Sequence, residues 1–257
     1  MNPILRKELR SLLRERRGWL VPGTYAALLS GMVYLSTARN GALPGPGVHP
    51  AQFGSSMAAL VAVMQTLAVA LVAPILGAAA ISSERERGTW TRLLGAPIAR
   101  WQIATGKFAA TSIYVVLMLL VSLPVASLAV LFGGMDLTAL TGLYTAHALL
   151  GVALGCLGLA ISTAFHRTWV ASVVAVAAVA TLVFLGDVSP LTFDAGARSG
   201  WVEVLRCFNP TYGTELFFRG DRLEESRRLW AIHFAALTSI AGASIAFVIV
   251  RVRSMVD

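Results

Sequence analysis

Six long stretches without a charged residue constrain this chain more than any other feature of its sequence. No Asp, Glu, Lys or Arg occurs in residues 18–38, 40–83, 108–135, 137–166, 168–186 or 229–250. A helix needs roughly 20 apolar residues to cross the hydrocarbon core of a bilayer, and each stretch is long enough to contain one. Membrane barrel strands are only about 10 residues long and alternate in polarity. The sequence therefore predicts an all-α polytopic membrane protein with six transmembrane helices.

The basic residues indicate how these helices are oriented. With the N-terminus inside, the inner segments hold 14 of the 21 Lys and Arg residues and the outer segments hold 7. Such a bias is typical of cytoplasmic loops. The net charge of +8 then follows from membrane topology, and we expect no nucleic-acid partner. We predict a multi-pass protein of the inner (cytoplasmic) membrane with both termini in the cytoplasm. Its abundant Arg, Ala and Gly indicate a bacterial source.

The N-terminal segment, residues 1–18, predicts an amphipathic interfacial helix. From Leu5 onwards, leucines recur at i, i+4, i+7 and i+8, while basic side chains take other faces. Such a helix suits the anionic lipid surface of the inner leaflet, so membrane lipid is an expected partner. A cleaved signal peptide is the alternative, but its basic segment and apolar run are normally shorter. Residues 19–257 then form the six-helix transmembrane domain.

The longest external segment, residues 187–228, contains apolar residues at helical spacing: Trp201, Val204, Leu205 and Phe208. It predicts an external helical segment between the fifth and sixth transmembrane helices. That segment either dips into the membrane interface or forms an ordinary surface subdomain.

Three glycines in the fourth stretch, Gly151, Gly155 and Gly158, have a spacing that lets membrane helices approach closely. Packing within the bundle and a subunit interface both fit this pattern.

Three strongly polar side chains fall at membrane depth: Gln65, His147 and His233. Polar groups inside a membrane are costly and often functional, so these residues are candidates for a translocation path. Interhelical hydrogen bonds are the simpler interpretation. A secondary transporter would be expected to carry buried carboxylates, and no Asp or Glu lies at this depth.

Catalytic and cofactor motifs are absent from the sequence. No phosphate-binding loop can form at Gly106-Lys107, because Phe108 follows and position 101 is Trp. No zinc-protease or serine-hydrolase motif occurs. Cys156 and Cys207 have neither a disulfide framework nor a metal-binding spacing. We expect that the chain is not an enzyme and carries no metal or cofactor.

A charged segment, residues 83–100, separates the second and third apolar stretches. Ser83 and Glu86 fit a capping box, and Thr89 is a plausible cap for a short helix ended by Gly95 and Pro97. The segment would present Trp90, Leu93 and Leu94 outward beside Arg and Glu side chains. It suits docking onto a cytoplasmic partner, or it is an inner loop that only enforces topology.

The sequence ERERGTWTRLLGAPIARWQIATGK, residues 84–107, resembles the segment after the second helix in type-2 ABC transporter permeases. The matching positions are Glu84, Arg85, Gly88, Thr89, Leu93, Leu94, Pro97, Arg100, Gly106 and Lys107. The N-terminal RKELR resembles that family's elbow helix, and the six-span plan and large fifth-to-sixth loop are similar too. The chain departs from the pattern at Thr91, where the family often has an acidic residue.

The resemblance implies that residues 83–100 form a coupling helix that docks on a separate cytoplasmic ABC ATPase, which holds ATP and Mg. The implied partner-binding residues are Glu84, Arg85, Glu86, Arg87, Gly88, Thr89, Trp90, Arg92, Leu93, Leu94 and Pro97. A second permease copy or a paralogue would complete a dimer. The chain would then be the membrane-spanning permease subunit of an exporter powered by that ATPase. The alternative is a non-transporting membrane anchor or assembly component coupled to an ATPase.

Overall fold

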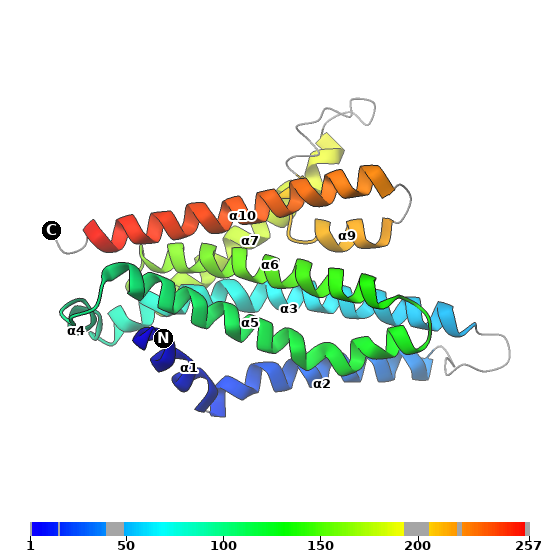
Figure 1. Ribbon diagram of the computed structural model, residues 1–257, viewed down its shortest axis with the longest axis horizontal. Helices are drawn as coiled ribbons and strands as arrows, with labels where there is room; N and C mark the ends of the chain where they lie inside the picture. Colours follow the sequence, from blue (N-terminus) through cyan, green and yellow to red (C-terminus); the bar gives the residue numbers. More distant parts are fainter. Residues whose placement is uncertain (1, 15, 40–48, 193–205, 220–222, 255–257) are drawn as a thin grey trace.

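The computed structural model describes residues 2–14, 16–39, 49–192, 206–219 and 223–254 (Figure 1). Within these ranges the chain is almost entirely helical and contains no strand. The helices are α1 (Pro3–Arg14), α2 (Arg16–Arg39), α3 (Pro50–Glu86), α4 (Trp90–Leu94), α5 (Arg100–Leu131), α6 (Leu137–Ser162), α7 (Thr168–Thr192), α9 (Tyr212–Arg219) and α10 (Leu223–Ser254). The predicted all-α fold is confirmed for the described residues.

Five of these helices are long and apolar enough to cross a bilayer: α3, α5, α6, α7 and α10. The predicted first span lies in α2, a continuous helix of 24 residues. Glycine, proline, serine and tyrosine residues lower the mean hydropathy of α2, and it is not among the five. The count of six transmembrane helices therefore stays a prediction.

The long helices lie side by side, with α4 at one end of the bundle and α9 toward the other (Figure 1). We call these the α4 end and the α9 end. The start of α1 and the end of α10 both lie at the α4 end. The central helix is α6, which packs against α3, α5, α7 and α10 and is the most buried of the five candidate spans.

Glycines bring the backbones of α3 and α6 into direct contact. A Cβ added to Gly158 would meet the carbonyl oxygen of Pro74, and one added to Gly77 would meet that of Gly155. Small residues allow such close approach between membrane helices. The interpretation of the α6 glycines as packing positions within the bundle is confirmed.

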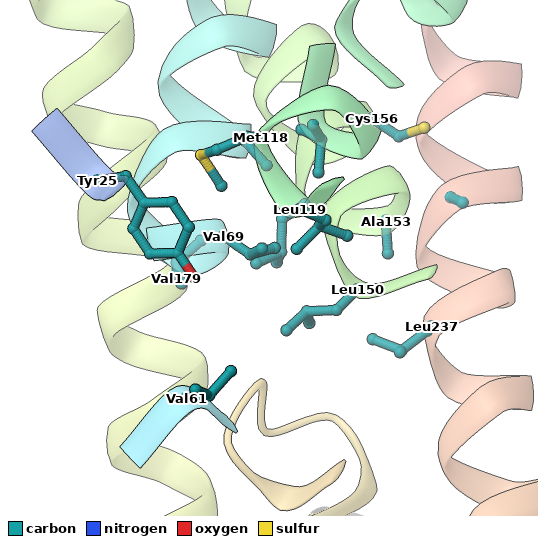
Figure 2. Close-up of a cluster of buried hydrophobic side chains, with 14 of the residues drawn as sticks. Tyr25, Val61, Val69, Met118, Leu119, Leu150, Ala153, Cys156, Val179 and Leu237 are labelled. Atoms are coloured by element: carbon teal, nitrogen blue, oxygen red, sulfur yellow. The ribbon is translucent and has the colours of Figure 1, made fainter. Parts of the chain in front are cut away.

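The main apolar core occupies the middle of the bundle (Figure 2). It draws side chains from α2, α3, α5, α6, α7 and α10, among them Tyr25, Val61, Val69, Met118, Leu150, Val179 and Leu237. Tyr25 reaches into this core from α2 (Figure 2). The core therefore joins helices that are far apart in the sequence.

At the α9 end, part of the predicted loop segment folds back on the bundle. A separate apolar cluster joins the chain around α9 to α10 through Cys207, Tyr212, Leu216, Leu229 and Ala236. Of the apolar residues named from the sequence, Phe208 packs against this cluster, whereas Trp201, Val204 and Leu205 lie outside the described residues.

Candidate functional site

The connection from α3 to α5 contains the short helix α4 in the place where the sequence predicts one. α3 continues to Glu86, and Gly88 then has a φ of +66°, a conformation that glycine adopts without steric cost. The Thr89 N–H donates to the Glu84 carbonyl oxygen at 2.9 Å. This turn reverses the chain and sets α4 beside the end of α3.

The predicted helix caps in this segment are wrong. Ser83 and Glu86 cannot form a capping box, because both lie inside the last turn of α3. Thr89 precedes α4, but its side chain does not cap that helix. Its hydroxyl instead hydrogen-bonds the carbonyl oxygen of Glu84 at 3.2 Å and the carboxylate of the same residue.

Trp90 fixes α4 to the bundle. Its side chain is 7% exposed and belongs to a cluster with residues from α1, α3, α5, α6 and α10: Ile4, Ile81, Ile103, Leu159, Val248 and Val252. The Arg85 guanidinium lies 5.8 Å from the centroid of the Trp90 ring, within the range of a cation–π interaction. The sequence-based expectation that α4 presents Trp90 outward is therefore wrong, because the ring faces its own bundle.

The outer face of α4 is formed by other residues. Leu93 and Leu94 are partly buried against the Trp90 cluster. Thr91, Arg92 and Pro97 are exposed. A partner that docks at this segment would thus meet a small polar and basic surface with two half-buried leucines at its margin.

Charged residues of the α4 end form an ion cluster that joins α1, α3 and α5. The Lys107 ammonium lies 2.8 Å from Glu8 and 3.7 Å from Glu84, and Lys7 lies 2.8 Å from the same Glu84 oxygen. The Lys107 side chain is 1% exposed. Burial of a lone ammonium is costly, so the two carboxylates are what allow Lys107 to be charged at this depth. The cluster lines part of a cavity of about 210 Å³.

The N-terminal helix α1 is seated directly on α5 next to this cluster. A Cβ at Gly106 would lie 2.8 Å from Ile4 Cβ and 3.0 Å from Asn2 Nδ2, so only glycine leaves room for α1. The Asn2 side chain accepts from the Ile4 N–H at 3.0 Å and donates to the Gln102 carbonyl at 2.7 Å. Asn2 thus both caps α1 and attaches α1 to α5.

Two charged side chains tie the end of α3 to the α6–α7 connection. Arg85 Nη1 donates to the Thr163 carbonyl at 2.8 Å, and the Thr168 N–H donates to Glu86 Oε2 at 3.0 Å. The side chains of Glu84, Arg85 and Glu86 thus bind other segments of the same chain. Glu86, Arg87, Gly88 and Arg92 are exposed, whereas Glu84 and Arg85 are partly buried.

The three polar residues proposed for a translocation path are all buried. Gln65 is 0%, His147 3% and His233 1% exposed. Gln65 lies near the middle of α3, where its Nε2 donates to Ser122 Oγ of α5 at 3.2 Å. The two histidines lie nearer the α9 end and contact the chain around α9.

His147 takes part in a hydrogen-bonded chain between α6, α3 and α9. Its Nδ1 lies 2.8 Å from the Leu143 carbonyl, which can only accept, so Nδ1 carries the proton. Its Nε2 lies 2.8 Å from the Thr66 hydroxyl, and Thr66 also donates to the Ala62 carbonyl at 2.9 Å. The Thr66 oxygen also lies 2.5 Å from the Thr214 hydroxyl of α9. The chain attaches α9 to the membrane helices.

His233 holds the chain before α9 to α10. Its Nδ1 donates to the Cys207 carbonyl at 2.8 Å, and its ring packs edge-on against Tyr212 and Trp230. A Cβ at Gly213 would lie 2.9 Å from the ring nitrogen Nε2. His147 and His233 thus have the same local effect, which is to fix residues 207–214 onto the bundle.

The described part of the chain holds no group of three or more His, Cys, Asp or Glu side chains able to bind a metal ion. Cys156 and Cys207 are both buried and form no disulfide with each other.

Comparison with known proteins decides the family. Residues 2–212, from α1 into α9, match the family described as "ABC-2 family transporter protein". This chain belongs to the ABC-2 transporter family. The matched region includes α4, the ion cluster, Gln65 and His147, so the features of the α4 end lie within the family region.

A curated relative of this ABC-2 family protein is "Probable ABC transporter permease protein NosY" from Stutzerimonas stutzeri. The two sequences are 34% identical over 127 residues, which make up 49% of this chain and 44% of the relative. The similarity thus spans less than half the length of the relative.

Several residues that organise the α4 end of this ABC-2 family protein were not predicted as site residues: Asn2, Glu8, Gly106 and Lys107. A signal for two of them was present, because Gly106 and Lys107 close the motif that resembles the family. Glu8 lies in the RKELR segment. Sequence spacing alone could not pair these two motifs, because 99 positions separate Glu8 from Lys107.

Proposed function

We propose that this chain is the membrane-spanning permease subunit of an ABC transporter that exports its substrate. ATP would be hydrolysed by a separate cytoplasmic ABC ATPase, which holds the nucleotide and Mg. The observation that carries this proposal is α4, a short helix in an ABC-2 family chain, fixed between the ends of two long candidate spans. The curated relative, described as an ABC transporter permease, supports the same role.

In this proposal α4 is the coupling helix and α1 the elbow helix. A coupling helix must transmit force, so it has to be held rigidly by its own bundle and still expose a surface. Burial of Trp90 meets the first need, and the exposed Thr91, Arg92 and Pro97 meet the second. Glu84, Arg85 and Glu86 would support the docking surface from behind, since their side chains bind neighbouring segments of the same chain.

The α4 end would face the cytoplasm of a bacterial inner membrane. Its support is the basic bias of the segments at this end. The start of α1 and the end of α10 lie at this same end (Figure 1), which requires an even number of crossings. An even number is reached when α2 crosses the membrane with the five more apolar helices. A second permease copy or a paralogue would complete the transporter.

The substrate path would run past the polar groups of the bundle. Gln65, His147 and His233 remain its candidates, and the support is strongest for Gln65. His147 reaches α9 through Thr66, and His233 Nδ1 bonds the chain before α9, which favours a role in holding the α9 end together.

Co-purification with an ABC ATPase from a neighbouring gene tests the docking surface. The tagged full-length chain should retain the ATPase, and Arg92→Glu should reduce the retained amount at least about fivefold, because a reversed charge at the centre of an interface is poorly tolerated. Arg10→Glu is the matched control, since Arg10 is an exposed arginine of α1 at the same end. Full retention by Arg92→Glu would contradict docking at α4.

Transport itself needs a second measurement. Inside-out vesicles that contain both subunits should accumulate a substrate only with hydrolysable ATP. Complex formation and ATP hydrolysis without any transport would instead identify an anchor or assembly component.

A further inference from the structure

A cavity of about 210 Å³ lies at the α4 end, between α1, α3 and α5. The ion cluster around Lys107 forms part of its lining. Among the lining residues, Lys107 and Ala110 are buried, whereas Lys7 and Arg87 are exposed. The cavity therefore extends from the surface of the bundle toward its interior.

The charged residues that line this cavity leave an excess of one positive charge. Three of them are basic and two are acidic: Lys7, Arg87, Lys107, Glu8 and Glu84. Each carboxylate lies 2.8 Å from a lysine ammonium, and neither forms an ion pair with Arg87 in the described structure. Glu86, the carboxylate next to Arg87 in the sequence, does not line the cavity and accepts from the Thr168 N–H. A ligand that neutralises the lining therefore carries one negative charge.

The two exposed basic side chains have the donors that a phosphate requires. An ammonium has three N–H donors, and Lys7 directs one of them to Glu84 at 2.8 Å. A guanidinium presents five donors in a planar fork that matches the oxygens of a phosphate, and Arg87 brings this fork to the same cavity. A phosphodiester carries a single negative charge and offers only acceptors, so it satisfies both side chains and balances the lining.

The cavity lies where the charged end of the bundle meets its charge-free part. The charge-free stretch of α3 ends just before Glu84, and that of α5 begins just after Lys107. On the charge-free side the lining includes Leu76, Ala79 and Ala110. A change from charged to apolar surface within a few helical turns matches a lipid from its headgroup to its acyl chains. The cavity is smaller than the pockets of about 300–1,000 Å³ that take drug-sized ligands, so it holds a headgroup and not the chains.

We propose that this cavity binds the headgroup of an anionic phospholipid with one phosphodiester, such as phosphatidylglycerol, from the bilayer leaflet at the α4 end. The phosphate accepts hydrogen bonds from Lys7 and Arg87, and the glycerol backbone lies against the apolar wall of α3. The acyl chains then follow α3, where Leu67 and Leu71 are 55% and 51% exposed. Basic pockets between membrane helices are known to take anionic headgroups. The site requires only a membrane-embedded bundle, so it is independent of coupling to an ATPase.

Native mass spectrometry tests the site in the full-length chain, delipidated in detergent and titrated with phosphatidylglycerol. We expect one phosphatidylglycerol molecule to bind before any other. Phosphatidylcholine with the same acyl chains should bind at least about fivefold more weakly, because its choline ammonium cancels the charge of its phosphate and a basic side chain then gains about 1 kcal/mol less. Glycerol phosphate, which has no acyl chains, should not displace the bound lipid at an equal concentration.

Two variants and one control identify the groups responsible. Arg87→Gln should weaken phosphatidylglycerol binding about fivefold, the effect of one basic side chain at a lipid phosphate. Arg10→Gln is the matched control, since Arg10 is an exposed arginine of α1 that does not line the cavity. Ala79→Phe fills the apolar side of the cavity and should abolish binding of the first lipid. Arg87→Gln should leave the unfolding midpoint of the delipidated protein unchanged, because Arg87 is exposed, so its weaker binding is not a result of misfolding.

Three results would overturn the proposal. Equal affinity for phosphatidylglycerol and phosphatidylcholine would show that the positive lining does not select the lipid. Equal binding by the Arg87→Gln and Arg10→Gln variants would show that lipid adsorbs to the basic surface without using the cavity. Displacement of the lipid by glycerol phosphate would identify a site for a free phosphate. These outcomes are separate from failure of the proposed function, because the titration contains no ATPase.

Discussion

The buried ammonium of Lys107 lies 2.8 Å from the carboxylate of Glu8, which connects the N-terminal helix to the interior of the transmembrane bundle. Lys107 also lies 3.7 Å from Glu84, at the end of α3. Three helices therefore meet at one cation, close to the helix that we propose docks on the ATPase. α1 is thus an integrated part of the bundle at the α4 end and not only an amphipathic helix on the lipid surface.

Loss of the Glu8 carboxylate should destabilise the protein. In Glu8→Gln, Lys107 keeps only the more distant Glu84, and loss of a hydrogen bond between charged groups costs about 1.5–3 kcal/mol. The thermal unfolding midpoint in detergent should fall accordingly. Lys7→Met is the control: Lys7 is 57% exposed, and exposed ion pairs contribute little. An unchanged midpoint in Glu8→Gln would mean that the Glu8–Lys107 pair does not stabilise α1.

A methyl group at Gly106 should displace α1. In Gly106→Ala the new Cβ would lie 2.8 Å from Ile4 Cβ, closer than carbon atoms pack, so α1 must move away from α5. Trypsin should then cleave α1 faster, at its exposed arginines. Gly31→Ala is a matched helical control with nothing within 4 Å of the new Cβ, and it should stabilise α2 by about 0.5–1 kcal/mol. Equal cleavage in both variants would contradict the seating of α1.

Truncation of Trp90 separates its role from that of its neighbour Arg92. Trp90→Ala should destabilise the bundle by about 3 kcal/mol, since it removes a buried aromatic side chain from a cluster shared by several helices. Arg92→Ala should change stability by no more than about 0.5 kcal/mol, because Arg92 is exposed. Unfolding midpoints in detergent measure both effects. Similar midpoints for the two variants would show that Trp90 does not fix α4 to the bundle.

How well the sequence predicts a feature of this structure depends on whether neighbouring or distant residues determine it. The long helices follow from continuous apolar stretches, so their existence and approximate bounds were predictable. The predicted capping box at Ser83 and Glu86 is wrong, because α3 continues as a helix through both residues. The orientation of Trp90 depends on a pocket built from five other helices, and no periodicity within a five-residue helix could reveal it.

Removal of the Thr66 hydroxyl should loosen α9. Thr66 is the middle group of the chain from Thr214 to His147, so Thr66→Val leaves two buried partners unsatisfied, at about 1–3 kcal/mol each. Thr214→Val removes only the terminal hydroxyl and should cost about 1 kcal/mol. Hydrogen exchange of the α9 amides should therefore accelerate more in Thr66→Val than in Thr214→Val. Thr238→Val is the control, since its exposed hydroxyl bonds only within α10. The reverse order of the first two variants would show that the hydrogen-bonded chain does not hold α9.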